Sequence, residues 1–408
     1  MGGDSGMKIV CVGGGPAGLS LAIFMKLHDS AHDIVVLERD EPGAAAGLGM
    51  TLGTRPLRMI ADRDPVLAEG IRDAQFAWGD QITRFRGERL IAKDSDSFSY
   101  SISRRRLVNV LTNRARQLGV RIEYGRNVQA VSELPEADLI VAADGVNSRI
   151  RQDAGGFSTN EVTGRNKYIW LGTTKVFEDF HFLFEQTDSG WLWAHAYGID
   201  PETSTFIVEC TPQTWAGLGL GAMPPRDALR FLEKAFGEHL DGHGLIGDLD
   251  NGRDPAWLNF RTITNQRWHA GNVVLVGDSA HTTHFAIGMG VTLAIEDASA
   301  LADSLREHAD VETALRAYEK RRQAELVPAQ VEAALSERWF ENIERYTRGK
   351  PRQFAVLLYA RRSPLIAVLP PFLGYALRRA VRQFPVLDDF RRRVAPAVKS
   401  AYGKRRPA

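Results

Sequence analysis

A glycine-rich turn near the N-terminus constrains the fold of this chain more than any other feature. Residues 8–12, Lys-Ile-Val-Cys-Val, form an apolar run that leads directly into Gly13-Gly14-Gly15-Pro16-Ala17-Gly18. Apolar residues then recur at helical spacing, and a second apolar run, residues 34–37, ends at Glu38. The succession of strand, glycine turn, helix and strand predicts a βαβ unit of a parallel sheet.

The spacing of the glycines indicates a dinucleotide site. Glycines permit a tight turn and a close approach of the backbone to a pyrophosphate, while the N-terminus of the following helix offers unpaired N–H groups. Glu38 stands twenty positions after Gly18, where a carboxylate can accept hydrogen bonds from ribose hydroxyls. Arg39 beside it does not by itself make the site specific for a 2′-phosphate. We expect an adenine dinucleotide to be bound by Gly13, Gly15, Pro16, Ala17, Gly18, Glu38 and Arg39.

The pattern of the remaining chain predicts an α/β fold into which a second sheet is inserted. Helical and strand patterns alternate up to about residue 165 and resume at about 259, which is typical of a Rossmann-like parallel sheet. Between 166 and 258, aromatic and β-branched runs separated by Gly, Asp or Pro predict antiparallel strands. We expect a discontinuous nucleotide-binding domain of residues 7–165 and 259–335, an inserted substrate-binding sheet, and a helical, basic region at 336–408.

Charge is unevenly distributed along the chain. The net charge is only +1, which gives no reason to expect a nucleic-acid partner, but residues 341–408 hold 16 Lys and Arg against 4 Asp and Glu. Apolar residues between these cations favour short amphipathic helices packed on the body. Two alternatives remain: a site for the phosphates of coenzyme A or the acidic surface of a carrier protein, and weak attachment to a membrane surface.

Cysteine usage and the N-terminus indicate the cellular compartment. Cys11 and Cys210 are far apart and have no metal-ligand spacing around them, so neither a disulfide framework nor a metal site is expected. The first residues show no basic leader followed by an apolar run, and no stretch is long and apolar enough for a transmembrane helix. We therefore expect a soluble, cytoplasmic protein.

Two further motifs follow predicted strands. Asp144-Gly145 comes after the apolar run 139–142, and Gly277-Asp278 comes after 272–276. A carboxylate at the end of a strand can hold a sugar or ribityl hydroxyl. A helix N-terminus, here opened by Gly288-Met289-Gly290, can stabilise negative charge on a reduced flavin ring.

In their order, these motifs resemble those of the single-component flavin-dependent aromatic hydroxylases, the p-hydroxybenzoate hydroxylase-like group. The resemblance implies that the glycine turn binds FAD, that Arg104 lies by the FAD pyrophosphate and that Asp278 contacts the ribityl chain. It places Asp144 where the flavin and a nicotinamide cofactor meet, and Gly288, Met289 and Gly290 beside the flavin. It also implies that NADH or NADPH reduces the FAD, and that O2 then forms a flavin hydroperoxide that hydroxylates an electron-rich aromatic ring.

Phe285 points to a narrower branch of that group, because most such hydroxylases have Pro at this position after His281. The variant is similar to a branch that contains salicylyl-CoA 5-hydroxylase, 2-aminobenzoyl-CoA monooxygenases and the tryptophan-derived pigment hydroxylase of violacein synthesis. It implies an aryl thioester of coenzyme A or of a carrier protein as the first choice of substrate, and an indole-derived substrate as the second.

Two other classes of function stay open. One is an FAD-dependent dehydrogenase or reductase without oxygen insertion, which the pair of motifs at Asp144 and Asp278 disfavours. The other is a flavin-bearing binding protein without turnover, which would be yellow but would show no substrate-stimulated oxidation of a nicotinamide cofactor.

Residues 191–197 offer candidates for orienting a substrate ring. In a strand, Trp191, Trp193, His195 and Tyr197 share one face, and the small or aliphatic residues between them share the other. Two interpretations have equal weight for His195 and Tyr197: they form ordinary sheet core, or they cover a flat aromatic substrate and bond its hydroxyl or amine. For Trp191 the core interpretation is favoured.

His281 and His284 lie on the loop that the resemblance places past the reactive edge of the flavin. A histidine there can stabilise the hydroperoxide by hydrogen bonding or take the ring proton after oxygen transfer. For His281 a role in capping the loop backbone is an equal alternative. For His284 a functional role is favoured, because a bulky polar residue replaces the usual small residue or Pro.

Overall fold

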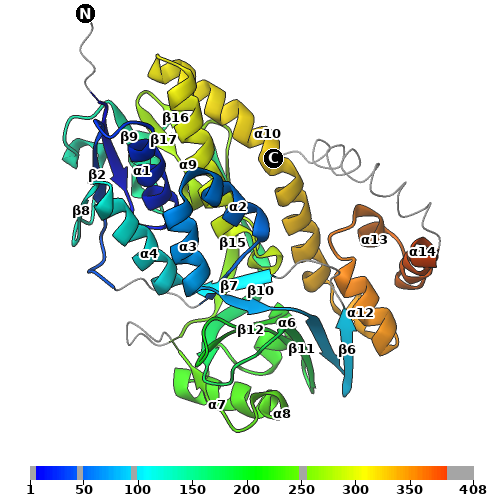
Figure 1. Cartoon of the computed structure of the whole chain (residues 1–408). Coiled ribbons are helices and arrows are strands. Elements are labelled where there is room, and N and C mark those ends of the chain that lie inside the picture. Colours follow the sequence, from blue (N-terminus) through cyan, green and yellow to red (C-terminus); the bar gives the residue numbers. More distant parts are fainter. Residues whose placement is uncertain (1–5, 44–48, 93–98, 248–254, 384–408) are drawn as a thin grey trace, which may run out of the picture.

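The computed structural model describes residues 6–43, 49–92, 99–247 and 255–383 of the 408-residue chain. Within these ranges the strands form three sheets, of six, eight and three strands. Figure 1 shows the six-stranded sheet with its helices in the upper part of the molecule and the eight-stranded sheet in the lower part.

The six-stranded sheet contains the predicted βαβ unit. Its strand order is β16-β17-β9-β1-β2-β8, and all neighbours pair in parallel except β16. Helices cover both faces, so its central strands are buried and almost wholly apolar, which is why they read as short apolar runs. The strands are β1 (Lys8–Val12), β2 (Asp33–Leu37), β8 (Arg121–Glu123), β9 (Leu139–Ala142), β16 (His269–Ala270) and β17 (Val273–Leu275).

Helices from distant parts of the sequence pack on this sheet. The glycine-turn helix α1 contacts both α9 and α4, and α9 contacts the long helix α10. The helices of this part are α1 (Pro16–His28), α2 (Thr54–Arg63), α3 (Pro65–Ala74), α4 (Arg104–Gln117), α5 (Arg149–Ala154), α9 (Gly290–Glu307) and α10 (Val311–Glu341), with 3₁₀ turns η1 (Val131–Glu133), η2 (Gly277–Ser279) and η3 (Phe285–Ile287). The predicted α/β fold class with an interrupted parallel sheet is confirmed.

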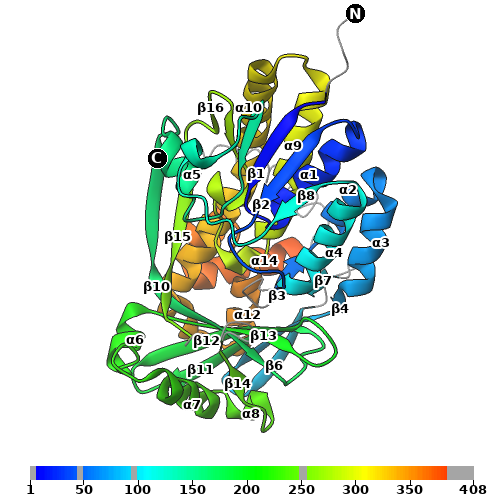
Figure 2. The same cartoon turned by 90° about the vertical axis from the view of Figure 1, so that its left-hand side faces the viewer.

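The eight-stranded sheet has the order β14-β10-β13-β12-β11-β5-β6, with β15 also paired to β10. All its pairs are antiparallel except β11 with β5. Figure 2 shows β10 and β15 running side by side from the level of the first sheet down to the second. The strands are β5 (Gln81–Phe85), β6 (Glu88–Ala92), β10 (Thr159–Thr173), β11 (Phe180–Thr187), β12 (Gly190–Gly198), β13 (Ser204–Cys210), β14 (Leu245–Ile246) and β15 (Leu258–Asn265).

The hairpin β5–β6 joins this sheet from a part of the chain that lies well before the predicted insertion. Its tight turn is Arg86-Gly87, where both residues have positive φ, of 51° and 75°. Such a turn matches the twist of a two-residue hairpin. The strand β6 is largely exposed and holds only a short apolar stretch, Leu90 to Ala92, which is too short to predict a strand.

A three-stranded sheet, order β3-β7-β4, joins the two larger ones. Gly49 at the start of β3 donates its N–H to the hydroxyl of Thr205 on β13 at 2.8 Å, and Ser101 on β7 donates to the carbonyl of Gly198 on β12. On the outer face of the eight-stranded sheet lie three short helices. The elements are β3 (Gly49–Leu52), β4 (Phe76–Trp78), β7 (Ser99–Ser103), α6 (Pro212–Gly217), α7 (Pro225–Ala235) and α8 (Gly237–Leu240).

The helices after α10 cover an aromatic cluster on the inner face of β11 and β12. Phe354 of α12 stacks on Phe85 with ring centroids 4.0 Å apart, and Phe340 of α10 stacks on Trp193 at 5.6 Å. These helices are α11 (Glu344–Thr347), α12 (Pro351–Tyr359), α13 (Pro364–Val368) and α14 (Pro371–Gln383). No helix among the described residues is long and apolar enough to cross a membrane.

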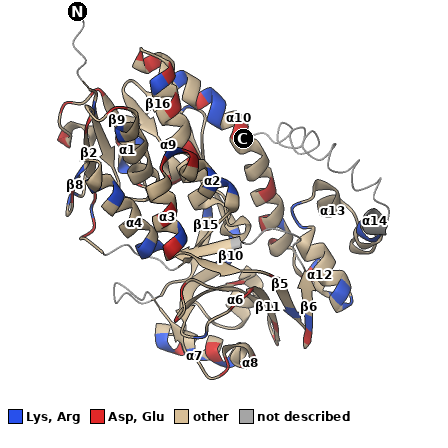
Figure 3. Cartoon of the chain, in the orientation of Figure 1, with Lys and Arg blue, Asp and Glu red and all other residues tan. Residues whose placement is uncertain are grey.

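The basic character of the C-terminal region is visible within the described residues. Residues 345–383 hold nine Lys and Arg and no Asp or Glu. Four of these cations belong to α12 and α14, where Figure 3 shows blue segments. The amphipathic-helix interpretation fits α12, which packs on the cluster, whereas α14 leaves Phe372 64% exposed. Residues 384–408 lie outside the described part, so the structure does not bear on the cations of that segment.

Candidate active site

A cavity of about 910 Å³ lies between the carboxyl ends of the parallel strands and the inner face of the eight-stranded sheet. Ligands of open α/β sheets bind at this edge of the parallel strands. One end of the cavity is lined by residues of the motifs that follow those strands, among them Gly15, Pro16, Ala17, Arg104, Asp278, Gly288, Met289 and Gly290. The other end is aromatic, with Tyr168, Trp170, Phe180, Phe182, His195, Tyr197 and Phe285.

The glycine turn is tight at its ends and open in its middle. Gly13 has φ +110°, and a Cβ there would lie 2.3 Å from the carbonyl oxygen of Ala143. A Cβ at Gly18 would lie 2.2 Å from the carbonyl oxygen of Gly13. At Gly15, by contrast, a Cβ would meet nothing within 4 Å, and this residue lines the cavity. A ligand can therefore approach the backbone of the turn closely at the point where α1 begins.

Glu38 holds this turn in place. Its carboxylate accepts hydrogen bonds from the N–H of Gly14 at 2.6 Å and from the N–H of Asp40 at 2.9 Å. The Arg39 side chain is exposed, contacts the carboxylate of Asp40 at 3.3 Å and is not among the residues that line the cavity. Glu38, predicted to contact a ribose, is likewise absent from the lining, so neither of these two predicted cofactor-binding residues faces the cavity.

Two long helices begin at the cavity without a side-chain cap. Gly15 precedes α1 and Met289 precedes α9, and neither helix has a capping side chain on its first N–H groups. Gly288, just before, has φ +66°, and its carbonyl oxygen accepts a hydrogen bond from the Thr51 hydroxyl at 2.9 Å. Free N–H groups and the positive ends of two helix dipoles favour anionic ligands.

The charged side chains in the wall are mainly cations. The lining contains five arginines but only two carboxylates, namely Arg55, Arg104, Arg261, Arg361 and Arg362 against Asp278 and Glu296. Burial raises the pKa of Asp278, and the nearby His281 and Arg104 counteract this effect. The balance of charge suits a ligand that carries phosphates.

Hydrogen bonds from Arg151 connect the loop after Asp144 to the loop after Asp278. Asp144 Oδ2 accepts from the N–H groups of Arg149 at 2.7 Å and Ile150 at 3.2 Å, and its buried Oδ1 has no partner among the described residues. The Arg151 guanidinium donates to the carbonyls of Ser279 and Val146, at 2.7 and 2.9 Å. Asp144 does not line the cavity, but its successors Gly145 and Val146 do.

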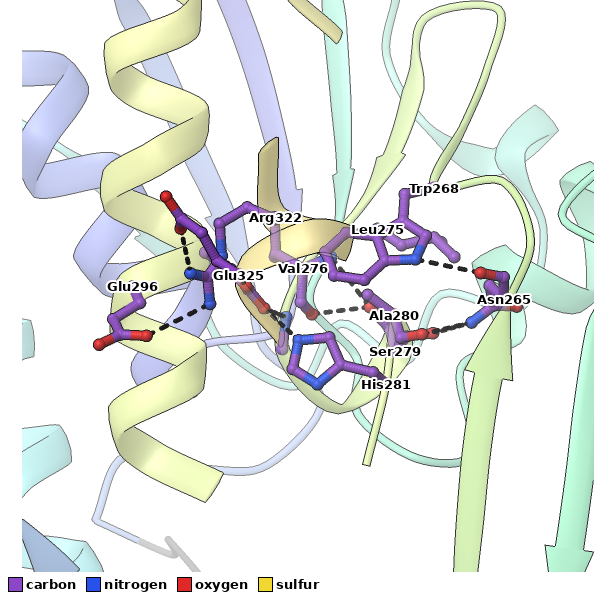
Figure 4. Close-up of polar contacts among 12 residues, drawn as sticks. Asn265, Trp268, Leu275, Val276, Ser279, Ala280, His281, Glu296, Arg322 and Glu325 are labelled. Atoms are coloured by element: carbon purple, nitrogen blue, oxygen red, sulfur yellow. Dashed lines mark hydrogen bonds and ion pairs between the residues drawn. The ribbon is translucent and has the colours of Figure 1, made fainter. Parts of the chain in front are cut away.

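His281 belongs to a buried ionic network behind the cavity wall (Figure 4). Its Nε2–H donates to Oδ2 of Asp297 at 2.8 Å, and the N–H of Gly277 donates to the same oxygen at 3.0 Å. The other oxygen of Asp297 accepts from Nε of Arg322 at 2.8 Å, and Arg322 also donates to Glu325 at 2.7 Å. The His281 side chain is buried and does not line the cavity.

His284 also lies behind the wall. Its Nδ1 accepts a hydrogen bond from the N–H of Ala286 at 3.3 Å, and its ring stacks on Phe285 with centroids 4.3 Å apart. Burial lowers the pKa of His284 to about 4, so the imidazole is neutral near pH 7. The ring that reaches the cavity from this loop is Phe285, which packs 4.9 Å from Tyr168.

The alternation predicted for residues 191–197 is present in β12. Trp191 and Trp193 join the aromatic cluster under α12, while the residues between them pack in the core beneath α7. His195 and Tyr197, further along the same face, line the cavity. The Tyr197 hydroxyl donates to the carbonyl of Gly49 at 3.0 Å, and burial raises its pKa.

His195 lies beside a buried carboxylate, Glu209 on the neighbouring strand β13. Glu209 is 1% exposed and accepts hydrogen bonds from Asn166 Nδ2 at 2.7 Å and from Trp193 Nε1 at 3.0 Å. Nε2 of His195 is 3.7 Å from Glu209 Oε2, which is longer than a hydrogen bond. Burial lowers the pKa of His195, with Glu209 opposing and Arg361 adding to the effect, so we treat the ring as neutral.

Several residues of this site were not singled out from the sequence. Glu209 is a lone carboxylate in the apolar run 205–210, and Arg361 interrupts the apolar run 354–369. A charged residue inside an apolar run is a usable signal, because such a residue is seldom buried unless it has partners or a function. The aromatic lining at Phe180 and Phe182 follows from strand alternation once β11 is placed.

Comparison with known proteins places this architecture among flavin enzymes. A family profile described as FAD binding domain matches residues 132–333. Salicyloyl-CoA 5-hydroxylase of a Streptomyces species is 37% identical over 88% of this chain and 70% of its own length. The 3-hydroxy-4-methyl-anthranilyl-[aryl-carrier protein] 5-monooxygenase of Streptosporangium sibiricum is 36% identical over 83% and 90%, and protodeoxyviolaceinate monooxygenase of Chromobacterium violaceum is 32% identical over 91% and 100%.

Solved structures show the same fold at lower sequence identity. A C294A variant of 2-methyl-3-hydroxypyridine-5-carboxylic acid oxygenase superposes with a TM-score of 0.69 at 22% identity, covering 90% of this chain and 98% of its own. PqsL of Pseudomonas aeruginosa, in complex with 2-aminobenzoylacetate, superposes with a TM-score of 0.66 at 19% identity, covering 84% and 98%.

Proposed function

Because this chain belongs to the family of FAD-dependent aromatic monooxygenases, we propose that it hydroxylates an aromatic ring carried as a thioester, using O2 and NADH or NADPH. The observation that carries the proposal is that one cavity has both a motif-lined end and an aromatic end. Two of the three relatives act, by their names, on aromatic groups bound to coenzyme A or to a carrier protein.

The residues at the first end fit FAD. The open space against Gly15 and the uncapped start of α1 suit its pyrophosphate, with Arg104 as a cation in the same wall. We assign Asp278 to the ribityl hydroxyls and Glu38, which also fixes the turn, to the ribose of the adenosine part. When bound, FAD supplies the electron transfer from the nicotinamide and the activation of O2, which side chains cannot perform.

The chain's own residues orient the substrate ring and exclude water. The rings of Tyr168, Trp170 and Phe182 make a dry wall for a flat ligand. We assign His195 to a hydrogen bond with the ring hydroxyl or amine, since it lies in this wall and its buried Nε2 has no hydrogen-bond partner among the described residues. Tyr197 already donates its proton to Gly49, so its oxygen is left to accept from a ligand.

The two loop histidines act through the backbone in this proposal. His281 anchors the Gly277-Asp278 turn through Asp297, and His284 caps the turn that carries Phe285. Both are positioning residues: they hold groups that face the cavity and do not face it themselves.

The cations of the wall support a thioester substrate. Arginines outnumber carboxylates in the lining, and although Arg55, Arg261 and Arg362 each lie within 4 Å of a carboxylate, the excess of cations favours a ligand with phosphates of its own. Coenzyme A and the phosphopantetheine arm of a carrier protein both have such phosphates.

The test is nicotinamide oxidation by the purified yellow protein in air. NADH and NADPH are each tried with salicyloyl-CoA, 2-aminobenzoyl-CoA, the corresponding free acids and a set of indole compounds. We expect a thioester to accelerate oxidation and to gain one oxygen atom by mass spectrometry. No acceleration by any thioester, on coenzyme A or on a carrier protein, would contradict the proposal.

An indole-derived substrate is the second candidate. The relative from Chromobacterium violaceum, a protodeoxyviolaceinate monooxygenase, is matched over its whole length, whereas the salicyloyl-CoA hydroxylase is matched over 70%. Acceleration by free indole compounds, with an oxygenated product and none from thioesters, would select this candidate and retain the same chemistry.

A further inference from the structure

Arg361, which follows α12, is a buried cation in the wall of the cavity. Its side chain is 4% exposed and belongs to the lining at the aromatic end. Within the described ranges no ion pair includes Arg361, whereas the neighbouring Arg362 lies 3.7 Å from Glu332. Buried charges are normally paired, because removing a charged group from water costs roughly several kcal/mol per ion.

The hydrogen bonds of Arg361 all go to neutral acceptors. Its Nε donates to the hydroxyl of Ser336 at 2.9 Å, Nη1 to the carbonyl of Leu358 at 3.0 Å and Nη2 to the carbonyl of Ala286 at 2.9 Å. A guanidinium has five N–H donors, so one on Nη1 and one on Nη2 remain. The positive charge itself is not neutralised by these bonds.

Arg361 and His195 flank the same two aromatic rings. The Arg361 Cζ lies 5.1 Å from the centre of the Phe182 ring and 5.6 Å from that of Phe340. The His195 ring lies 5.1 and 5.3 Å from the same two rings. The proposed ring-binding histidine and the unpaired cation therefore belong to one corner of the cavity.

This corner is electrostatically unfavourable without an anion. Burial lowers the pKa of Arg361 well below its usual range, although a guanidinium stays protonated in proteins. The charged and titratable groups that act on it are Arg362, Tyr359, Glu209 and Glu332, and its own charge acts on His195. A negatively charged atom of a ligand beside Nη1 or Nη2 would relieve the cost.

We propose that Arg361 determines specificity by binding an anionic oxygen on the substrate ring, so that a ring hydroxyl is held as its phenolate. The hydroxyl proton passes to water on binding, and no electrons are transferred in this step. A phenolate is richer in electrons than a phenol, and the attack on an electrophilic oxygen is faster for the richer ring. The inference rests on the proposed function and adds the residue that holds the ring oxygen.

A ring oxygen is favoured over a carboxylate as the anion. A thioester has no free carboxylate, since its carbonyl is neutral, so a ring hydroxyl is the group that can carry charge at the aromatic end. Guanidinium N–H groups bind oxyanions with charge-assisted hydrogen bonds, which are roughly twice as strong as neutral ones.

The test uses a chromophoric phenol and needs no turnover. The probe is 4-nitrophenol, whose phenolate absorbs visible light, titrated into the FAD-bound protein at several pH values. The matched ligand is 4-nitroanisole, which has the same ring but cannot ionise, with affinity measured by calorimetry. We expect the wild-type protein to lower the apparent pKa of the bound probe by about one unit, which corresponds to about a tenfold preference for phenolate.

Variants distinguish the effect of the Arg361 charge from its part in supporting the cavity wall. Arg361→Gln should lose about tenfold in affinity for the phenolate and less than about twofold for 4-nitroanisole, while Arg361→Lys should keep part of the pKa shift. Ser336→Ala removes the side-chain partner of Nε, and Arg352→Gln removes an exposed cation of α12. Both should retain the wild-type preference for phenolate.

Two results would overturn the assignment. One is an equal loss of both ligands in Arg361→Gln, which would mean that the residue only supports the wall. The other is a wild-type protein in which the probe shows no lowered pKa. Failure of every thioester to give product, with the phenolate preference intact, would contradict only the proposed function.

Discussion

The carboxylate of Asp297 joins His281 to the turn at Gly277, with Oδ2 lying 2.8 Å from the His281 ring and 3.0 Å from the Gly277 nitrogen. Asp297 lies on α9, whose N-terminus opens to the cavity. One buried carboxylate therefore fixes the loop that carries Asp278 relative to the helix assigned to the flavin.

Replacement of Asp297 should destabilise the fold. Asp297→Asn removes the charge that balances Arg322, and breaking a buried ion pair costs about 3 kcal/mol. We expect a loss of unfolding free energy of that size and weaker retention of FAD. Denaturant titration and the flavin absorbance of the purified protein measure both. Glu307→Gln, an exposed change on the same helix, is the control, and equal stability of the two variants would contradict the prediction.

A side chain at Gly15 should abolish cofactor binding without unfolding the chain. The position is open in the turn, so Gly15→Val adds its methyl groups to the space assigned to the pyrophosphate. We expect a folded, colourless protein, checked by circular dichroism and the visible spectrum. Gly237→Val, also without neighbours within 4 Å but outside the cavity lining, should stay yellow. A yellow Gly15→Val protein would refute the placement of FAD.

Loss of the His195 ring should separate nicotinamide oxidation from hydroxylation. His195→Asn leaves the cofactor end intact but removes the group assigned to orient the ring, and a misplaced ring reacts poorly. We expect the yield of product per nicotinamide oxidised to fall by about tenfold. Trp191→Phe, on the same face but outside this cavity, should keep the yield. Unchanged coupling in His195→Asn would show that this residue serves only the packing of the sheet.

The buried His284 should make the protein less stable in mild acid. Its folded-state pKa of about 4 lies below the unfolded value of 6.5, so the unfolded chain binds more protons between these values. Stability from this group is present above pH 6.5 and falls as the pH drops, by about 2 kcal/mol at pH 5.

His284→Asn should remove that part of the pH dependence, because an amide cannot be protonated in this range. The measurement is the difference in unfolding free energy between pH 7 and pH 5. The exposed His243 gives the control variant His243→Asn, which should retain the wild-type difference. If the two variants lose stability equally on acidification, His284 is not the group responsible.

The sequence predicted the elements whose patterns are local. The βαβ unit at residues 8–38 and the alternation at 191–197 follow from periodicity, and the structure has both. The motifs at Gly15, Asp278 and Gly288 meet in one cavity because each follows the carboxyl end of a parallel strand or opens a helix at that edge.

What the sequence did not reveal depends on tertiary contacts. The hairpin β5–β6 extends the second sheet through a parallel pair with β11, which no local pattern encodes. The ring of His281 lies outside the cavity lining because it donates a hydrogen bond to Asp297, sixteen residues later. In the sequence Arg361 looks like any other cation of the basic tail, and only its tertiary contacts with the Phe182 and Phe340 rings show that it is buried.

The late position of α12 in the chain has a consequence for biosynthesis. The strands β11 and β12 leave the ribosome long before Phe354 and Phe340, the residues that cover their aromatic face. Until then a broad apolar surface of the nascent chain faces water, a condition that promotes aggregation. The cofactor end can thus form while translation continues, whereas the substrate end is completed only when the last helices arrive, and chains released early will depend on chaperones.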